Sequence, residues 1–106
     1  MKLPTMTLLV ALISSTAANE WTLYCGISCS DGTAIASGSD YQAASCTNLD
    51  SSYEYCYFES DESWYYAVVY QNVDCVVSSD GPETPIPPGG CTSAGDFNSY
   101  QVALNL

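Results

Sequence analysis

Alternation of apolar and polar residues is the clearest pattern in this chain, and it predicts β-strands. The segment NEWTLYCGISC has apolar residues at every second position: Trp21, Leu23, Cys25, Ile27 and Cys29. The C-terminal segment SYQVALNL alternates in the same way, with Tyr100, Val102 and Leu104 on one face. We therefore expect a half-buried strand at each end of the folded domain.

The segments between these two give weaker signals. TAIAS, after an Asp31-Gly32 turn signal, and NVDCVVSS, residues 72–79, are expected to form short strands. Ser39 or Asp40 would cap one short helix through YQAASCTN, residues 41–48. The alternative there is a loop or strand, because the threonine and asparagine that end this stretch are poor helix formers. DGPETPIPPGG is expected to be a stiff, extended loop.

Residues 53–70, YEYCYFESDESWYYAVVY, predict a β-hairpin whose loop is ESDES, residues 59–63. Cys56 orients the first arm, because a disulfide-bonded cysteine normally points into the core. Side chains alternate along a strand, so Phe58, Trp64 and Tyr66 are expected on the buried face with Cys56. The opposite, outer face would carry four tyrosines: Tyr53, Tyr55, Tyr57 and Tyr65.

These elements predict an α+β fold, in which an antiparallel sheet dominates and one short helix accompanies it. An all-β fold is the alternative. The first eighteen residues are excluded from the domain, because a lysine, a short apolar run and small residues up to Ala18 are typical of a secretory signal peptide. Residues 19–106 would then form a single secreted, extracellular domain, which we expect to be a monomer.

Six cysteines follow the predicted signal peptide: Cys25, Cys29, Cys46, Cys56, Cys75 and Cys91. An even number in a small secreted chain predicts three disulfides, each contributing about 2–4 kcal/mol to stability. Within one strand, Cys25 and Cys29 would lie about 13 Å apart, too far for a mutual bond. They should therefore bond to two different elements, while the rest of the connectivity stays open.

The charge balance excludes whole classes of partner. The chain has twelve acidic residues and no histidine, and its single basic residue is Lys2, inside the predicted signal peptide. A domain without cations cannot neutralise phosphates, so we expect it to bind no nucleic acid. The same deficit argues against binding to an anionic membrane.

The residue types also argue against catalysis. Without histidine, lysine or arginine the domain has no conventional triad or cationic clamp, and six paired cysteines leave no thiol nucleophile. Two carboxylates could in principle hydrolyse a glycoside, although the domain is small for such a cleft. The acidic residues Glu59, Asp61 and Glu62 match no EF-hand spacing. We therefore expect no enzyme activity, no catalytic residues, no metal and no cofactor.

The four outer-face tyrosines are the candidate binding residues. Tyrosines held rigidly on a sheet present a contact surface, apolar in the ring and polar at the hydroxyl, that suits an extracellular protein or a polysaccharide. The competing interpretation is that another part of the chain covers this face and makes it a second small core.

The leader MKLPTMTLLVALISSTAA, the six cysteines and a body rich in tyrosine and serine together resemble the small secreted cysteine-rich, effector-like proteins of filamentous fungi. The spacing C-x3-C-x16-C-x9-C-x18-C-x15-C differs from chitin-binding, hydrophobin and elicitin patterns, so the resemblance is one of format. It implies secretion, no enzymatic activity, and a role, including in virulence, through binding a host or competitor protein. A carbohydrate-binding module using the tyrosine face and a killer-toxin-like secreted protein are the alternatives.

Overall fold

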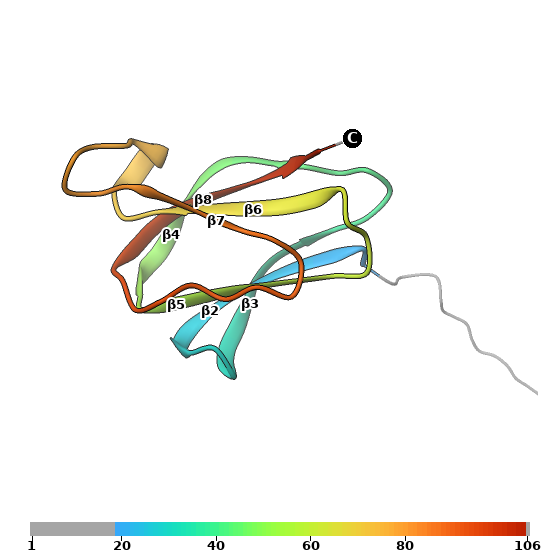
Figure 1. Cartoon of the computed structure of the whole chain (residues 1–106), viewed down its shortest axis with the longest axis horizontal. Helices are drawn as coiled ribbons and strands as arrows, with labels where there is room; N and C mark the ends of the chain where they lie inside the picture. The colour runs from blue at the N-terminus through green and yellow to red at the C-terminus, as the bar shows by residue number, and fades with distance from the viewer. Residues whose placement is uncertain (1–18, 106) are drawn as a thin grey trace, which may run out of the picture.

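Two antiparallel sheets make up the fold in the computed structural model, which describes residues 19–105 (Figure 1). The predicted signal peptide, residues 1–18, lies outside the described residues. The strands are β2 (Trp21–Ser28), β3 (Asp31–Gly38), β4 (Ala44–Tyr53), β5 (Tyr55–Ser60), β6 (Tyr65–Tyr70), β7 (Glu83–Ile86) and β8 (Phe97–Leu104). The fold of this part of the chain is therefore all-β, which was the alternative, and the predicted α+β fold with one short helix is wrong.

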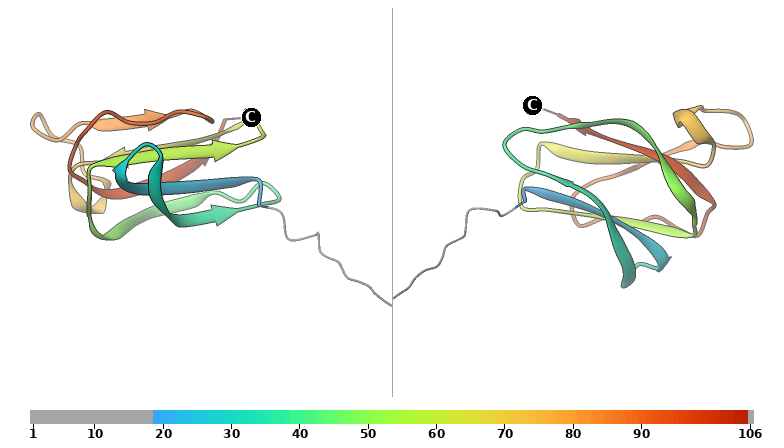
Figure 2. Two further views of the ribbon diagram at one scale, coloured as in Figure 1. Left: turned by 90° about the horizontal axis from the view of Figure 1, so that it is seen from below. Right: turned by 180° about the vertical axis from the view of Figure 1, so that it is seen from behind.

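One sheet has the strand order β3-β2-β5, and the other has the order β4-β8-β6-β7. The two sheets pack face to face as a sandwich, with the β2–β3 hairpin projecting from one end (Figure 2). In the first sheet, β2 and β5 pair in a regular register that sets Leu23 opposite Phe58 and Cys25 opposite Cys56.

The core fills the space between the sheets. It is built from alternate residues of the strands, as the sequence pattern predicts for β2 and β8: Trp21, Leu23 and Cys25 are buried, and so are Tyr100 and Val102. The apolar alternation of β2 continues beyond the core, however. Ile27 follows the pattern, but its side chain is 71% exposed on the projecting hairpin. A periodic pattern identifies a strand, but not how much of it a second sheet covers.

The predicted hairpin of residues 53–70 is wrong. Its two arms are strands β5 and β6, but β5 pairs with β2, whereas β6 pairs with β8 and β7. The residues between them, 61–64, cross from one sheet to the other (Figure 1). This crossing brings aromatic rings of both arms into the shared core. The ring centroid of Trp21 lies 6.0 Å from that of Phe58 and 6.5 Å from that of Tyr65.

The predicted helix over residues 41–48 is also wrong, because most of this segment belongs to β4. Asp40 and Tyr41 have φ angles of 56° and 63°, in the left-handed region, which a right-handed helix cannot continue. The serines and threonine that follow compete with helical hydrogen bonding and are compatible with a strand. β4 gains its partner from the far end of the chain, since it pairs with β8.

Two loop regions also differ from expectation. The segment NVDCVVSS contains only the short 3₁₀ turn η2 (Val73–Cys75), not a strand. Conversely, the proline-rich segment contains the edge strand β7, in which Pro85 pairs with Val68. Proline is tolerated there because an edge strand has a side that faces no partner.

All six cysteines are paired, in the bonds Cys25–Cys56, Cys29–Cys91 and Cys46–Cys75. Cys25 and Cys29 bond to different elements, as their spacing in a strand predicts. Three disulfides are consistent with folding in an oxidising, extracellular compartment. Within residues 19–105 there is no helix with the length and apolar character that a membrane span requires.

Candidate functional site

Three tyrosines gather on the outer face of the sheet β3-β2-β5, the face turned away from the core. Cys56 and Phe58 of β5 point inward. Side chains alternate along a strand, so Tyr55 and Tyr57, which lie on either side of Cys56, point outward. Tyr24 of β2 lies directly opposite Tyr57 in the β2–β5 register and points the same way. We call Tyr24, Tyr55 and Tyr57 the tyrosine patch.

The patch is built around one stacked pair. The ring centroids of Tyr24 and Tyr57 lie 4.7 Å apart, and their planes differ by 8°. The Tyr24 hydroxyl donates a hydrogen bond of 3.2 Å to Glu59 Oε1, at the next outward position of β5. Cross-strand aromatic pairs of this kind stabilise a sheet and restrict both side chains.

A glycine of β3 leaves room for the ring of Tyr57. Gly26 lies opposite Tyr55 on β2, and Gly32 lies opposite Gly26 on β3. A Cβ atom at Gly32 would lie 3.1 Å from Cε1 of Tyr57, so the ring of Tyr57 reaches across the sheet over this position. A larger residue there would push the ring away from the sheet.

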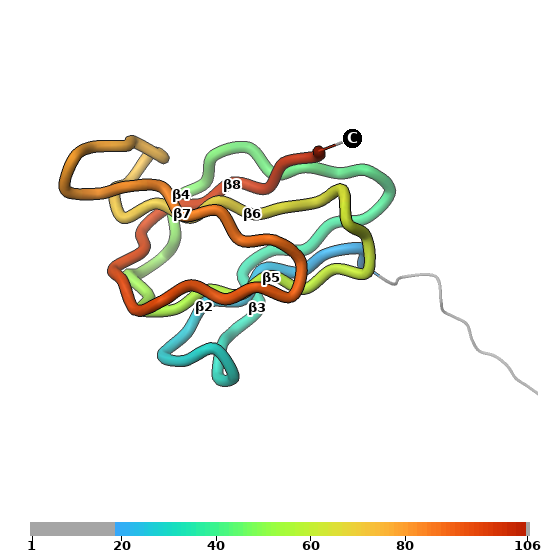
Figure 3. Tube along the Cα trace, viewed as in Figure 1, coloured from blue at the N-terminus to red at the C-terminus, as the bar shows by residue number. Residues whose placement is uncertain are grey.

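Disulfides hold the strands under the patch in place. Cys25–Cys56 joins β2 to β5 on the buried face, one residue along each strand from the stacked tyrosines. The segment that contains Cys91 runs alongside the other edge of β5 (Figure 3). The Phe58 N–H donates a hydrogen bond to the Gly90 carbonyl of this segment. Cys91 is bonded to Cys29, so both flanks of the patch are covalently fixed.

The electrostatic surroundings of the patch are uniformly acidic. Partial burial raises the pKa of the Tyr24 hydroxyl, and the hydrogen bond to Glu59 raises it further. The hydroxyl therefore stays protonated at neutral pH and remains a donor to the carboxylate. No basic side chain exists in residues 19–106 to neutralise Glu59.

The structure places the four sequence-predicted tyrosines in three different surroundings. Tyr55 and Tyr57 are half-buried and share the outer face, as predicted. Tyr53 ends β4 in the other sheet, packs against the core and donates a hydrogen bond of 2.8 Å to Asp50 Oδ1. Tyr65 is fully buried, so the prediction that it lies on the outer face is wrong. The reason is the crossing between β5 and β6, which ends the alternation on which the prediction depended.

Tyr24 is the patch residue that sequence reasoning missed. The signal for it was present, because Leu23 and Cys25 on either side are predicted to point inward. The same reasoning that used Cys56 to orient Tyr55 and Tyr57 applies to Cys25 and its neighbour Tyr24. What the sequence does not contain is the register that sets Tyr24 opposite Tyr57.

The remaining chemistry of the described part is sparse. Among residues 19–105, no group of three or more histidine, cysteine or acidic side chains is arranged to hold a metal ion. Comparison with family models, with curated proteins and with solved structures found no match.

Proposed function

We propose that this chain is a secreted, non-enzymatic recognition protein, effector-like in its role, that binds an extracellular host or competitor protein through the tyrosine patch. The observation that supports this most is the stacked pair Tyr24–Tyr57, which lies on the face of the sheet β3-β2-β5 that is turned away from the core. Tyrosine gives a large contact area for a small loss of side-chain entropy, and aromatic residues are common among the dominant contacts of protein interfaces.

Preorganisation strengthens this proposal. The stack and the Tyr24–Glu59 hydrogen bond hold two of its side chains, and the two disulfides hold the strands that carry them, before any partner arrives. A surface that is already ordered loses less conformational freedom on binding, so more of the contact energy appears as affinity.

Charge indicates what kind of protein surface would fit. The chain has a formal net charge of −11, and its only basic residue precedes the described domain. A partner with lysine and arginine side chains would be steered toward it, and its cations could contact both Glu59 and the tyrosine rings. Binding should therefore weaken as salt is raised.

The proposal can be tested by capture of extracellular proteins on the immobilised domain. The double variant Tyr24→Ser/Tyr57→Ser removes the stack, and Tyr66→Ser changes a half-buried tyrosine of the other sheet as the matched control. We expect proteins retained by the wild type and by the control, but lost from the double variant, provided that melting curves show all three folded. Identical retained sets from all three would contradict the proposal.

Carbohydrate binding is the second candidate, and a different pair of rings favours it. Tyr41 is 55% exposed and stacks on Trp64, with ring centroids 5.6 Å apart and planes differing by 22°. An exposed ring backed by a second ring offers a flat face on which a sugar can stack. Retention on insoluble chitin, glucan or cellulose that is lost in Tyr41→Ala, but kept in Tyr24→Ser/Tyr57→Ser, would favour this function instead.

A further inference from the structure

A groove of about 300 Å³ opens between the two sheets, on the side where their edge strands β3 and β4 lie. Its apolar part is formed by Ile35, Leu49, Tyr53 and Tyr100, and its polar rim includes Asp50. This volume is at the lower end of the range of about 300–1,000 Å³ that is typical of ligand sites. None of the residues that line the groove belongs to the tyrosine patch, although Ala34 at the groove pairs with Tyr24 across the sheet.

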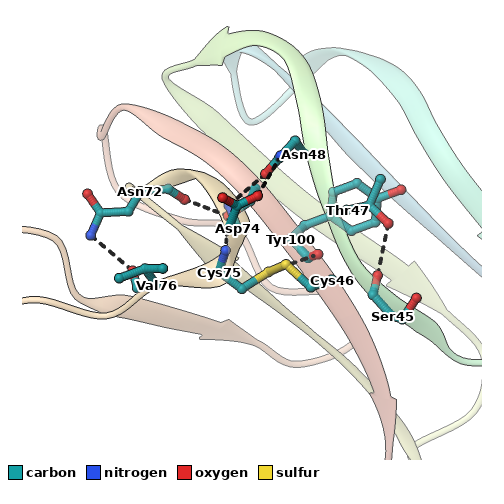
Figure 4. Close-up of a disulfide and its surroundings, with 10 residues drawn as sticks. Ser45, Cys46, Thr47, Asn48, Asn72, Asp74, Cys75, Val76 and Tyr100 are labelled. Atoms are coloured by element: carbon teal, nitrogen blue, oxygen red, sulfur yellow. Dashed lines mark hydrogen bonds between the residues drawn. A yellow bond between two sulfur atoms is a disulfide. The ribbon is translucent and has the colours of Figure 1, made fainter.

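The polar donors that β4 brings to this groove are already engaged within the protein. The Asn48 side-chain amide donates to Asp74 Oδ1 at 2.9 Å, and its oxygen accepts the Asp74 N–H at 2.7 Å (Figure 4). The Thr47 hydroxyl donates to the Ser45 carbonyl at 2.9 Å. A ligand that can only accept hydrogen bonds is therefore poorly served by this strand.

The groove offers a hydrogen-bond acceptor instead, the carboxylate of Asp50. The Tyr53 hydroxyl donates to Asp50 Oδ1 at 2.8 Å and so holds the carboxylate beside the aromatic ring. Asp50 itself is exposed, and residues 19–106 contain no lysine, arginine or histidine that could pair with it. Its charge can be matched only by a cation from another molecule, and an ordered carboxylate binds such a cation better than a freely rotating one.

We propose that this groove binds an arginine side chain from an extended basic segment of a partner protein. The guanidinium group carries only donors, which suits a site whose free polar group is a carboxylate. It is planar and can stack on an aromatic ring such as Tyr53, whereas the ammonium of lysine is a compact, strongly hydrated charge. The aliphatic stem of the arginine would lie on Ile35 and Leu49.

This inference goes beyond the proposed function, because it assigns a second site with its own ligand chemistry. The test is a titration of the ¹⁵N-labelled full domain with acetyl-Gly-Arg-Gly-amide in about 0.15 M salt, where diffuse charge attraction is screened. The citrulline peptide of the same shape is the neutral counterpart. We expect saturable shifts confined to residues 33–35 and 47–53 with the arginine peptide, and no such shifts with the citrulline peptide.

Two variants of equal charge make the test specific. Asp50→Asn should weaken binding by at least about tenfold, since hydrogen bonds to a charged group are the stronger kind. Asp61→Asn, which removes an exposed carboxylate at the crossing between β5 and β6, should leave the affinity unchanged. Tyr24→Ser/Tyr57→Ser should also bind the peptide normally, so loss of the tyrosine-patch function and loss of groove binding can be told apart.

Three results would overturn the inference. Equal losses in Asp50→Asn and Asp61→Asn would indicate attraction to net charge alone. Equal shifts with the citrulline peptide would show that the cation is not recognised. Saturable groove shifts with a β-glucan hexasaccharide, unaffected by Asp50→Asn, would identify a sugar site instead.

Discussion

Tyr57 and Tyr65 are close in the sequence but have opposite surroundings. Tyr57 stacks on Tyr24 at the surface, whereas Tyr65 is fully buried. The Tyr65 hydroxyl donates a hydrogen bond to Glu20 Oε1 and accepts one of 3.0 Å from the Tyr41 N–H. Its hydroxyl therefore links the residue before β2 to the turn before β4, while its ring packs in the core. Tyr65 thus stabilises the folded state.

Tyr65→Phe should lower the free energy of unfolding by about 1–3 kcal/mol, because it removes two hydrogen bonds and leaves a partly buried N–H group without its acceptor. Chemical denaturation measures the difference. Tyr66→Phe is the matched control, since Tyr66 is only half-buried and none of the hydrogen bonds found among residues 19–105 involves its hydroxyl. Equal losses in the two variants would contradict the role assigned to Tyr65.

The cysteines show how far single residues could guide a prediction. Taking Cys56 as inward-pointing correctly orients β5, with Phe58 buried and Tyr55 and Tyr57 on the outer face. The same inference fails for Tyr65, because it assumes that ESDES, residues 59–63, is a hairpin loop. Alternation is a local property, so it gives no information once the chain changes sheets.

β4 is held partly by contacts from outside its own sheet. It pairs with β8 at only four positions, and its register shifts twice along the strand. The Cys46–Cys75 disulfide and the paired hydrogen bonds between Asn48 and Asp74 tie it to the turn η2 (Figure 4). We infer that this covalent link keeps β4 in place where the ladder is irregular.

Replacing Cys46 and Cys75 together by serine should therefore loosen β4 selectively. Hydrogen exchange should accelerate at residues 44–53 and 73–77, while the amides of β2, β5 and β6 stay protected. By contrast, Cys25→Ala/Cys56→Ala removes a fully buried bond at the centre of the core, and should lower the global stability by about 2–5 kcal/mol. Uniformly faster exchange in the first variant would contradict the local role of its disulfide.

Strand pairing is the part of this fold that the sequence does not contain. β2 and β8 are predictable because their apolar alternation is local and strong. The partners of β5 and β6 are set by the shared core of two sheets, which brings together residues far apart in the chain. A strand at β4 is only an alternative to the predicted helix, because Ser45, Thr47 and Asn48 show little apolar alternation, and its pairing partner lies about fifty residues further on.

Taken together, the domain combines a strongly acidic surface with buried tyrosines. Burial raises the pKa of Tyr65 and Tyr70 above the ordinary value of 10.0, and the carboxylates of Glu20 and Glu83 raise them further. The folded state therefore holds these phenol protons more tightly than the unfolded chain does. The stability that follows is fully present below about pH 10 and is lost as the pH rises through the raised pKa values.

Denaturation midpoints should accordingly be similar at about pH 8 and pH 9, and should fall between about pH 10 and pH 12. Each group with a raised pKa can contribute at most about 1.4 kcal/mol per pH unit in that window. In Tyr65→Phe the decline should be shallower, because one such group is gone. Stability that rises with pH above 10, or a decline of the same slope in the variant, would contradict this explanation.

The proposed recognition function requires that the tyrosine patch is open to solvent while Tyr65 is not. Nitration of the native protein with tetranitromethane, followed by peptide mass spectrometry, measures this for each tyrosine. We predict early modification of Tyr55 and Tyr57 and of the exposed Tyr41, with Tyr65 unmodified until the protein unfolds. Protection of Tyr55 and Tyr57 equal to that of Tyr65 would show that the patch is covered, and would contradict the recognition surface proposed for this protein.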